Sequence, residues 1–303
     1  MKGMYRKKRL SLLIAVVLVC LGSVTLFAAG GSAVTDWENE VISGTGYGTP
    51  PDRAKNPGHA RILAHQAAML DAYRRLAEQA KGIHITADST MEDNILSGDI
   101  VSGEVDAVIK RAKIVPGSET YDEYGNCTVT LEVPLYGVSN SIAKVALKPV
   151  AKEAFPAPTV NVSVSVGGGA ATPSAQSSGS SAASAPASGN VGAQGGYTGL
   201  IVDCSGLGLN PVMSPVIRND GGQPIYGYKN LDYDKVVAQG MASYANGKNG
   251  NTSRAGSNPL VVKATGVENH NSYPVISTSD ANRVLTENQA SHFLDNCAVV
   301  FIR

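Results

Sequence analysis

Two histidines and a serine near the C-terminal end offer residue types that hydrolases use. Ser291 and His292 are adjacent, and His270 precedes them. A serine nucleophile needs a base within hydrogen-bond reach and a turn that exposes its hydroxyl, such as Gly-x-Ser-x-Gly. No such turn surrounds Ser291, so the sequence favours histidines that are exposed or hydrogen-bonded. We predict no catalytic residue and no enzymatic activity.

Carboxylates and glycines of the same region could bind a metal or a phosphate. Asp203, Asp232 and Asp234 lack the alternating acidic loop with a terminal Glu that binds calcium, and capping of a helix by Asp232 or Asp234 is the favoured interpretation. Gly206-Leu-Gly208 follows an apolar strand, but Asn210-Pro211 prevents the helix whose first turn would hold a phosphate. We therefore predict a turn there, and neither a metal nor a cofactor.

The cysteines have no zinc-site spacing, since there is no Cys-x-x-Cys and the histidines are scattered. Cys20 lies in the apolar N-terminal segment, which leaves Cys127, Cys204 and Cys297. Cys127 belongs to the apolar face of an alternating strand, which indicates a buried free thiol. Cys204 and Cys297 are the pair that could form a disulfide, because each adjoins an apolar strand; two unpaired thiols are the alternative.

The N-terminal segment has the pattern of an export signal. Five basic residues, all within Met1–Arg9, precede an apolar run from Leu10 to Ala29, and small residues follow up to Ala33. A signal peptide over residues 1–33, with the mature chain starting at Val34, is expected. The run is also long enough for an uncleaved membrane anchor, and that alternative stays open. Cys20 is a poor lipidation site, because Val19 before it is not small.

Removal of this leader changes the charge of the chain. All five bases of the leader are lost and no acid is, so 20 Lys and Arg face 25 Asp and Glu, a net charge of about −5. An acidic chain without a basic run is a poor partner for nucleic acid. We expect an exported protein of the periplasm, the outer membrane or the cell surface, where membrane association is possible.

Composition divides the mature chain into two domains. The stretch from Ala154 to Gly196 has no charged residue and is rich in Ala, Ser and Gly. Such a segment buries too little apolar surface to offset its ordering entropy. Val160 to Val166 alternates with polar residues at the strand period, so we end the first domain at residue 166. The predicted organisation is a domain over 34–166, a disordered linker over 167–196 and a domain over 197–303.

The first domain reads as a helix on a mainly antiparallel sheet. A strand over Glu40–Tyr47 precedes a long helix over His59–Ala80, whose apolar stripe contains Ile62, Met69, Tyr73 and Leu76, with Leu70 beside it. Further elements are a strand over Ile83–Ala87, a short helix over Gly103–Arg111 and an antiparallel pair over Lys113–Tyr121 and Cys127–Tyr136.

The second domain is also predicted to be α+β, with helices packed on a mainly antiparallel sheet. Strands are expected over Gly199–Cys204, Val212–Arg218, Pro224–Tyr228, Leu260–Val267 and Ala298–Ile302, and helices over Tyr233–Tyr244 and Asp280–Phe293. Asn219-Asp220-Gly221-Gly222 predicts a hairpin turn, because these residues tolerate positive φ. The last strand is apolar on both faces, which suits a central position. The Gly- and Asn-rich loop over Asn246–Asn258 is expected to be mobile.

The long helix carries a family resemblance. Ala60-Arg61, Ala67-Ala68 and Asp71-Ala-Tyr-Arg-Arg-Leu-Ala-Glu78, followed by Gly82-Ile-His-Ile85, resemble the Lpp-twenty lipoprotein family, whose relatives include flagellar assembly proteins P and T. The resemblance covers about Trp37 to Lys148. The C-terminal part, with Tyr197-Thr-Gly-Leu-Ile-Val-Asp203, resembles a domain of similar exported bacterial proteins. The chain lacks the lipobox cysteine that the family name implies.

This resemblance implies an envelope component rather than an enzyme. We expect a structural or assembly role in the bacterial cell envelope, with a link to the flagellar basal body or the outer membrane, and with envelope proteins or further copies of the chain as partners. Two domains on a tether without a catalytic cluster suit such a role. The alternative is an extracytoplasmic module that binds a ligand or polymer, which would need a concave site with convergent polar groups.

Overall fold

The computed structural model of this 303-residue chain describes residues 31–91, 93, 99–159 and 193–303. The predicted leader up to Gly30 and the predicted strand over Val160–Val166 lie outside the described residues. The first part contains β1 (Ser32–Asp36), β2 (Val41–Gly48), α2 (Pro57–Lys81), α4 (Asp99–Ile109), β3 (Lys113–Ile114), β4 (Thr120–Tyr121), β5 (Cys127–Pro134) and α5 (Ile142–Ala146). Its strands form an antiparallel sheet in the order β1-β2-β5-β3, with β4 also paired to β5.

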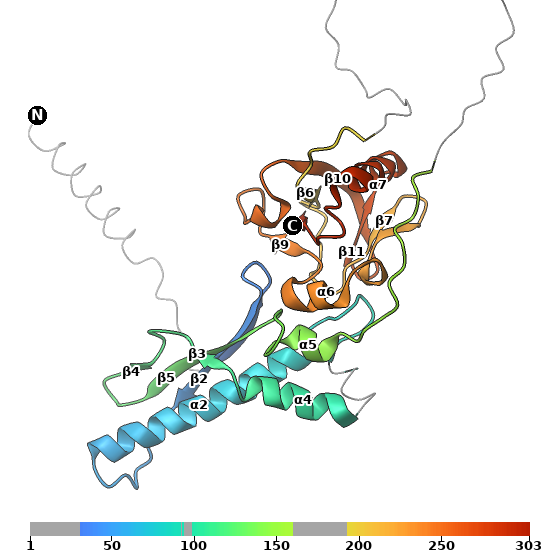
Figure 1. The fold of residues 1–303 in the computed structure, drawn as a ribbon. Coiled ribbons are helices and arrows are strands. Elements are labelled where there is room, and N and C mark those ends of the chain that lie inside the picture. The colour runs from blue at the N-terminus through green and yellow to red at the C-terminus, as the bar shows by residue number, and fades with distance from the viewer. Residues whose placement is uncertain (1–30, 92, 94–98, 160–192) are drawn as a thin grey trace, which may run out of the picture.

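Helix α2 lies along this sheet, as Figure 1 shows. Asn56 caps its first turn by accepting a hydrogen bond from the N–H of His59, and Pro57 follows at a position where a missing N–H costs nothing. The side chains that the helix buries recur every four residues, and they are Ala64, Ala68, Ala72, Leu76 and Ala80. The helix therefore presents a ridge of small side chains to the sheet.

The prediction of which side chains of α2 are buried was wrong in part. Leu76 is buried as expected, but Ile62 and Leu70 are 58% and 72% exposed. The reason lies in β2, where a Cβ added to Gly46 would come within 2.0 Å of the Ala68 carbonyl oxygen. Backbone this close at Gly46 leaves room for alanine but not for leucine, whereas Leu76 packs against the sheet at Gly44. The larger side chains of the helix consequently lie on its flanks and outer face.

The second part contains a seven-stranded sheet in the order β8-β7-β11-β10-β6-β12-β9. Its strands are β6 (Gly199–Asp203), β7 (Ile217–Asn219), β8 (Pro224–Tyr226), β9 (Ser243–Ala245), β10 (Pro259–Glu268), β11 (Tyr273–Ile276) and β12 (Val299–Ile302). The helices are η1 (Tyr228–Asn230), α6 (Tyr233–Gln239), η2 (Ser253–Ala255) and α7 (Thr278–Ser291).

Four neighbouring strands of this sheet, β10, β6, β12 and β9, run parallel. The prediction of a mainly antiparallel sheet is therefore wrong for the second part, although the α+β class is confirmed. The continuous burial of β6 and β12 explains the difference, since parallel strands are covered on both faces. The hairpin turn at Asn219–Gly222 is confirmed, and the last strand is an inner strand between β6 and β9, one place from the edge. Strands β9 and β11 were missed, and the predicted strand over Ile83–Ala87 joins neither sheet.

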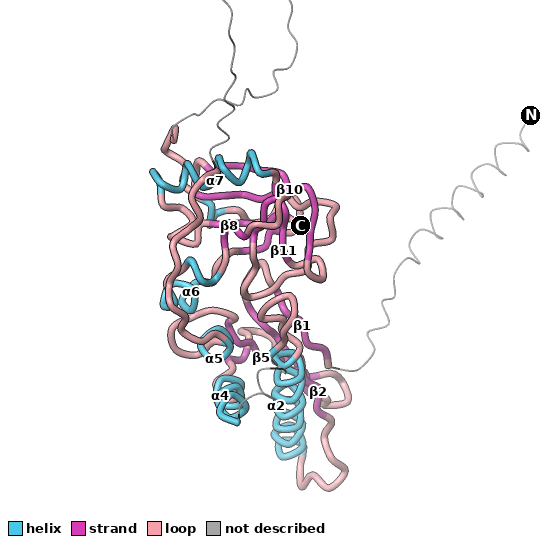
Figure 2. Tube along the Cα trace, turned by 90° about the vertical axis from the view of Figure 1, so that its right-hand side faces the viewer, coloured by secondary structure: helices cyan, strands magenta, loops and turns pink. Residues whose placement is uncertain are grey.

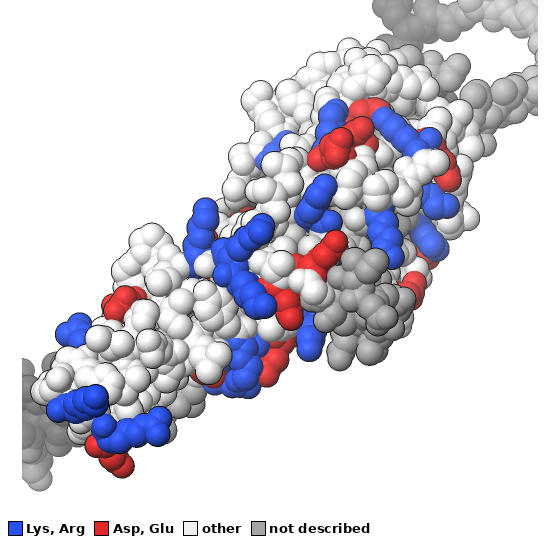
Figure 3. Space-filling model, turned by 60° about the horizontal axis from the view of Figure 1, so that its bottom comes forward, with Lys and Arg blue, Asp and Glu red and all other residues white. Residues whose placement is uncertain are grey.

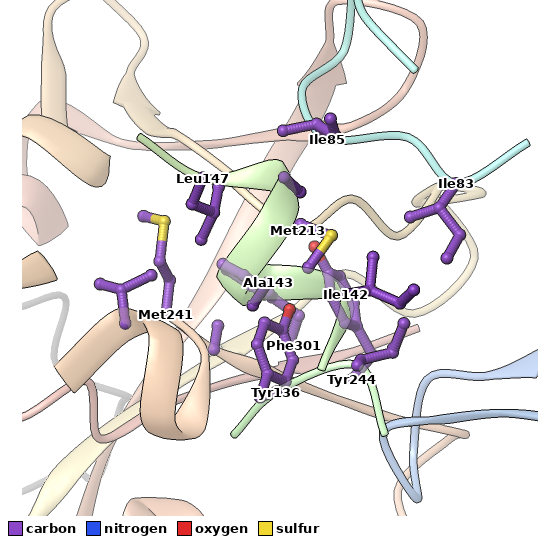
Figure 4. Packing of buried hydrophobic residues seen from close by; sticks show 14 of the residues in the cluster. Ile83, Ile85, Tyr136, Ile142, Ala143, Leu147, Met213, Met241, Tyr244 and Phe301 are labelled. Carbon is purple, nitrogen blue, oxygen red and sulfur yellow. The ribbon is translucent and has the colours of Figure 1, made fainter. Parts of the chain in front are cut away.

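The two parts share one apolar core. A single cluster of buried side chains contains residues of both, and Figure 4 shows where they meet. Tyr136 and Ile142 of the first part lie there beside Met241, Tyr244 and Phe301 of the second. Figure 2 shows from the side that the second part lies directly against one end of the first. The two parts are therefore in direct contact, because each covers apolar surface of the other.

The segment after α5 also differs from the prediction. Residues 147–159 run in extended form over the second part (Figure 1) rather than closing the first domain. Phe155 stacks on Tyr226 at 6.3 Å between ring centroids, and the Glu153 N–H donates to the Lys229 carbonyl. No helix of the described part combines the length and the apolar composition that crossing a membrane requires.

Candidate functional site: the cleft between the two parts

The turn between β1 and β2 carries charged side chains from the first part to the second. Asp36 shapes this turn, because its carboxylate accepts hydrogen bonds from the backbone N–H groups of Glu38 and Asn39 at 3.0 Å. Glu40 adopts a left-handed φ of 57°. Trp37 packs edge-on against Tyr244 at 5.6 Å. The turn is thereby fixed against β9.

Glu38 binds the polar loop of the second part. Its two carboxylate oxygens accept hydrogen bonds from Asn246 Nδ2 at 2.8 Å and from the Asn251 N–H at 2.7 Å. The same loop contains η2, whose Ala255 is fully buried. The loop predicted to be mobile is therefore anchored in the structure at both its ends and its middle.

Glu40 and Arg254 form an ion pair between the parts, with Arg254 Nη2 at 2.6 Å from Glu40 Oε1. The two side chains are only 25% and 17% exposed. The guanidinium also donates to the carbonyl oxygens of Gln239 at 2.5 Å and Gly240 at 3.4 Å. Burial raises the pKa of Glu40, and the charge of Arg254 opposes that rise.

These groups line a polar cleft of about 540 Å³. Its walls are polar except for one alanine, and they consist of Glu38, Asn39, Glu40, Gln239, Ser243, Asn251, Ser253, Arg254, Asn296 and Ala298. The Ser243 hydroxyl is buried and has no hydrogen-bond partner within the described part of the chain. A buried hydroxyl without a partner costs free energy, and this oxygen lies behind the cleft wall rather than in contact with the cleft.

A second hollow of about 510 Å³ lies between β1 and loops of both parts and contains His84 and His270. His270 Nδ1 lies 3.2 Å from the Ala87 carbonyl oxygen and 3.6 Å from Asp88 Oδ1. His292 instead ends α7, with Nδ1 3.6 Å from Asp295. Ser291 donates its hydroxyl to the carbonyl of Glu287 within the helix. The residues considered for hydrolysis therefore contact different segments.

The acidic and glycine motifs have structural roles. Asp232 caps α6 through the Lys235 N–H at 3.0 Å, as predicted. Asp203 accepts from the Ser205 N–H at 3.0 Å, and Gly206 and Gly208 have positive φ in a turn, also as predicted. Among the described residues, no group of three or more His, Cys, Asp or Glu could hold a metal ion.

Of the two alternatives for Cys204 and Cys297, the structure has the unpaired thiols, and both residues are buried, like Cys127. The parallel register of β6 and β12 gives the reason. Leu200 pairs with Val299, so Cys297 lies level with the start of β6 while Cys204 follows its end. The strand from Leu200 to Cys204 alone spans about 13 Å, and Cys297 lies before the residue that pairs with Leu200, whereas a disulfide needs Cα atoms within about 7 Å. Burial raises the pKa of Cys204 to about 12.

Glu40, Arg254 and Ser243 were missed by sequence reasoning. Arg254 lies in a loop that looks solvent-exposed, and its partner is more than two hundred residues away in the chain. No local pattern encodes such a pair; covariation between the two positions would be the signal to search for.

Residues 199–303 match a domain of a bacterial protein. The matching family is described as Treponema pallidum Tp0624, second domain. The match begins with β6 and covers roughly a third of the chain. The Lpp-twenty family and flagellar families are not among the matches. No curated protein matches the chain.

Proposed function

We propose that this chain is a non-enzymatic, exported bacterial cell-envelope protein with a structural or assembly role. The observation that carries the proposal is that the charged groups of the cleft contact one another or the opposite part. Glu40 and Arg254 neutralise each other, and Glu38 holds the loop of the opposite part. These groups join the two parts into one body and leave no acid-base pair for catalysis.

Two further observations support an envelope role. The C-terminal match is to the second domain of a bacterial protein, and the N-terminal helix resembles lipoprotein and flagellar assembly modules. Figure 3 shows Lys and Arg interspersed with Asp and Glu on the face it presents, which suits protein partners better than nucleic acid. We infer that the partners are envelope proteins or further copies of the chain, at the outer membrane or the flagellar basal body.

A deletion strain tests this function. Loss of the gene should sensitise the envelope to detergent or impair flagellar assembly, and the wild-type gene should restore the phenotype. His270→Ala and His292→Ala are matched variants, since both side chains are exposed. Each should restore the phenotype fully if the role is structural. Failure of either variant to do so, at normal protein level, would favour an enzyme.

A second candidate is a module that binds a saccharide polymer, and the polar lining of the cleft is the observation that favours it. Amides, a carboxylate and a hydroxyl, as in this cleft, bind the hydroxyl groups of sugars. Titration with soluble fragments of cell-wall glycan should then produce binding heat. Ser253→Ala should weaken that binding while leaving stability unchanged, because Ser253 is an exposed residue of the cleft wall. No binding by the wild-type chain would eliminate this candidate.

A further inference from the structure

Three residues that precede Val34 belong to the folded protein. Ser32 pairs with Thr45 and Ala33 pairs with Gly44 in the antiparallel ladder of β1 and β2. A cut after Ala33, which the small residues Gly31 and Ala33 invite, would remove two of the five paired residues of β1. The strand that bears the turn into the cleft would then be reduced to Val34–Asp36.

Gly31 also fits the fold closely. A Cβ at this position would lie 2.1 Å from the Thr45 carbonyl oxygen and 2.3 Å from Arg75 Nε. Arg75 cannot easily yield, because its Nε donates to Asp71 at 2.8 Å and Asp71 also accepts from the Tyr47 N–H. Position 31 therefore requires glycine for a reason that is independent of any peptidase.

Residues that a peptidase removes cannot contribute to the folded mature protein. Because residues 31–33 pair and pack in the fold, we expect them to remain in the mature protein. A secretory peptidase needs small residues one and three positions before the cut. Gly30 and Ala28 supply them for a cut before Gly31, whereas cuts after Ala29 or Ala28 would place Phe27 or Leu26 at the third position. The residues on both sides of the Gly30–Gly31 bond are thus compatible with cleavage there.

We propose that the leader is removed by hydrolysis of the Gly30–Gly31 amide bond, which leaves a carboxylate on Gly30 and the mature amino terminus on Gly31. This inference rests on the export part of the proposed function. It moves the start of the mature chain three residues upstream of the position that composition alone indicates.

The test is the intact mass and N-terminal sequence of the full chain, tagged at its C-terminus and exported from a bacterial host. The expected start is Gly31. Gly30→Leu should block or displace cleavage, whereas Ala33→Leu, the matched control, should leave the start unchanged. A start at Ser32 or Val34 would overturn this inference alone. Retention of Met1 would overturn signal cleavage itself, which separates the two failures.

A second measurement tests the premise. Chains produced directly from Gly31 and from Val34 should differ in stability, with a lower urea midpoint for the shorter chain, because β1 loses paired residues. Equal midpoints would mean that residues 31–33 contribute nothing to the fold and would remove the basis of the proposal.

Discussion

At the scale of single residues, the Glu40–Arg254 pair determines how the two parts respond to pH. Burial raises the pKa of Glu40 above its ordinary value of 4.5. The folded chain thus binds this proton more tightly than the unfolded chain. The stability that Glu40 contributes is present below pH 4.5 and is lost as the pH rises through the raised pKa. Arg254 limits that loss by compensating the buried carboxylate.

Replacing Arg254 by methionine should therefore have a pH-dependent cost. We expect Arg254→Met to lower the free energy of unfolding by about 2 kcal/mol at pH 7, since it leaves a buried carboxylate unpaired. The cost should shrink near pH 4.5, where Glu40 takes up a proton. Urea unfolding at both pH values measures it.

The control for this variant is Lys248→Met, which removes an exposed charge from the same loop and should cost less than about 0.5 kcal/mol. A cost for Arg254→Met that is equal at both pH values would contradict the role assigned to Glu40.

The contrast between Asp232 and Arg254 explains which site residues the sequence could predict. Asp232 caps the helix that starts beside it, so its role follows from neighbours in the chain. The role of Arg254 depends on a turn in the other part of the molecule. The distance between Cys204 and Cys297 could not be predicted for a related reason. It depends on whether their neighbouring strands run parallel, which composition does not encode.

At the scale of elements, the contact between α2 and β2 combines two patterns of small residues. Gly44, Gly46 and Gly48 alternate along the strand and face the alanine ridge of the helix. Sequence periodicity located the helix to within two residues at each end. It misplaced the buried stripe because hydrophobicity ranks Ile62 and Leu70 above alanine, whereas Gly46 and Gly48 leave room only for small side chains opposite them.

Gly46→Ala tests this contact. The added Cβ would overlap the Ala68 carbonyl and the Ala72 N–H, at 2.0 and 2.3 Å, and would push the helix off the sheet. We expect a loss of about 3 kcal/mol in the free energy of unfolding. Gly103→Ala is the control, because a Cβ on Gly103 in α4 has nothing within 4 Å. That variant should gain about 0.5–1 kcal/mol from helix propensity. Similar values for the two variants would refute the close packing.

At the scale of the whole molecule, the charge-free composition of residues 154–196 predicts a flexible linker between two separate domains. Composition identifies where a chain cannot form a core, but it does not reveal whether the flanking parts pack together. Here the Gly137 N–H donates to the Val237 carbonyl at 2.7 Å, and the Met213 N–H to the His84 carbonyl at 3.0 Å. Backbone hydrogen bonds of this kind, together with the shared apolar core, join the two parts directly.

Cleavage between residues 167 and 192 should therefore leave the molecule assembled. Limited proteolysis there should give two fragments on a denaturing gel that still co-elute as one species from a sizing column. Urea should separate them, which serves as the control for complete cleavage. Separate elution without urea would show that the shared core is too weak to hold the parts.

Both borders of the undescribed stretch 160–192 attach to the same helix. Thr159 donates its N–H to Asn282 Oδ1, and Gln194 and Gly195 donate theirs to Glu287. These two positions of α7 are about 7.5 Å apart along the helix axis. The described chain thus stops and resumes near one point of the surface, and doubling the length of a flexible segment that joins two such positions would cost only about 0.6 kcal/mol in closure entropy. Insertions, deletions or a further domain at this position should therefore leave the shared core undisturbed.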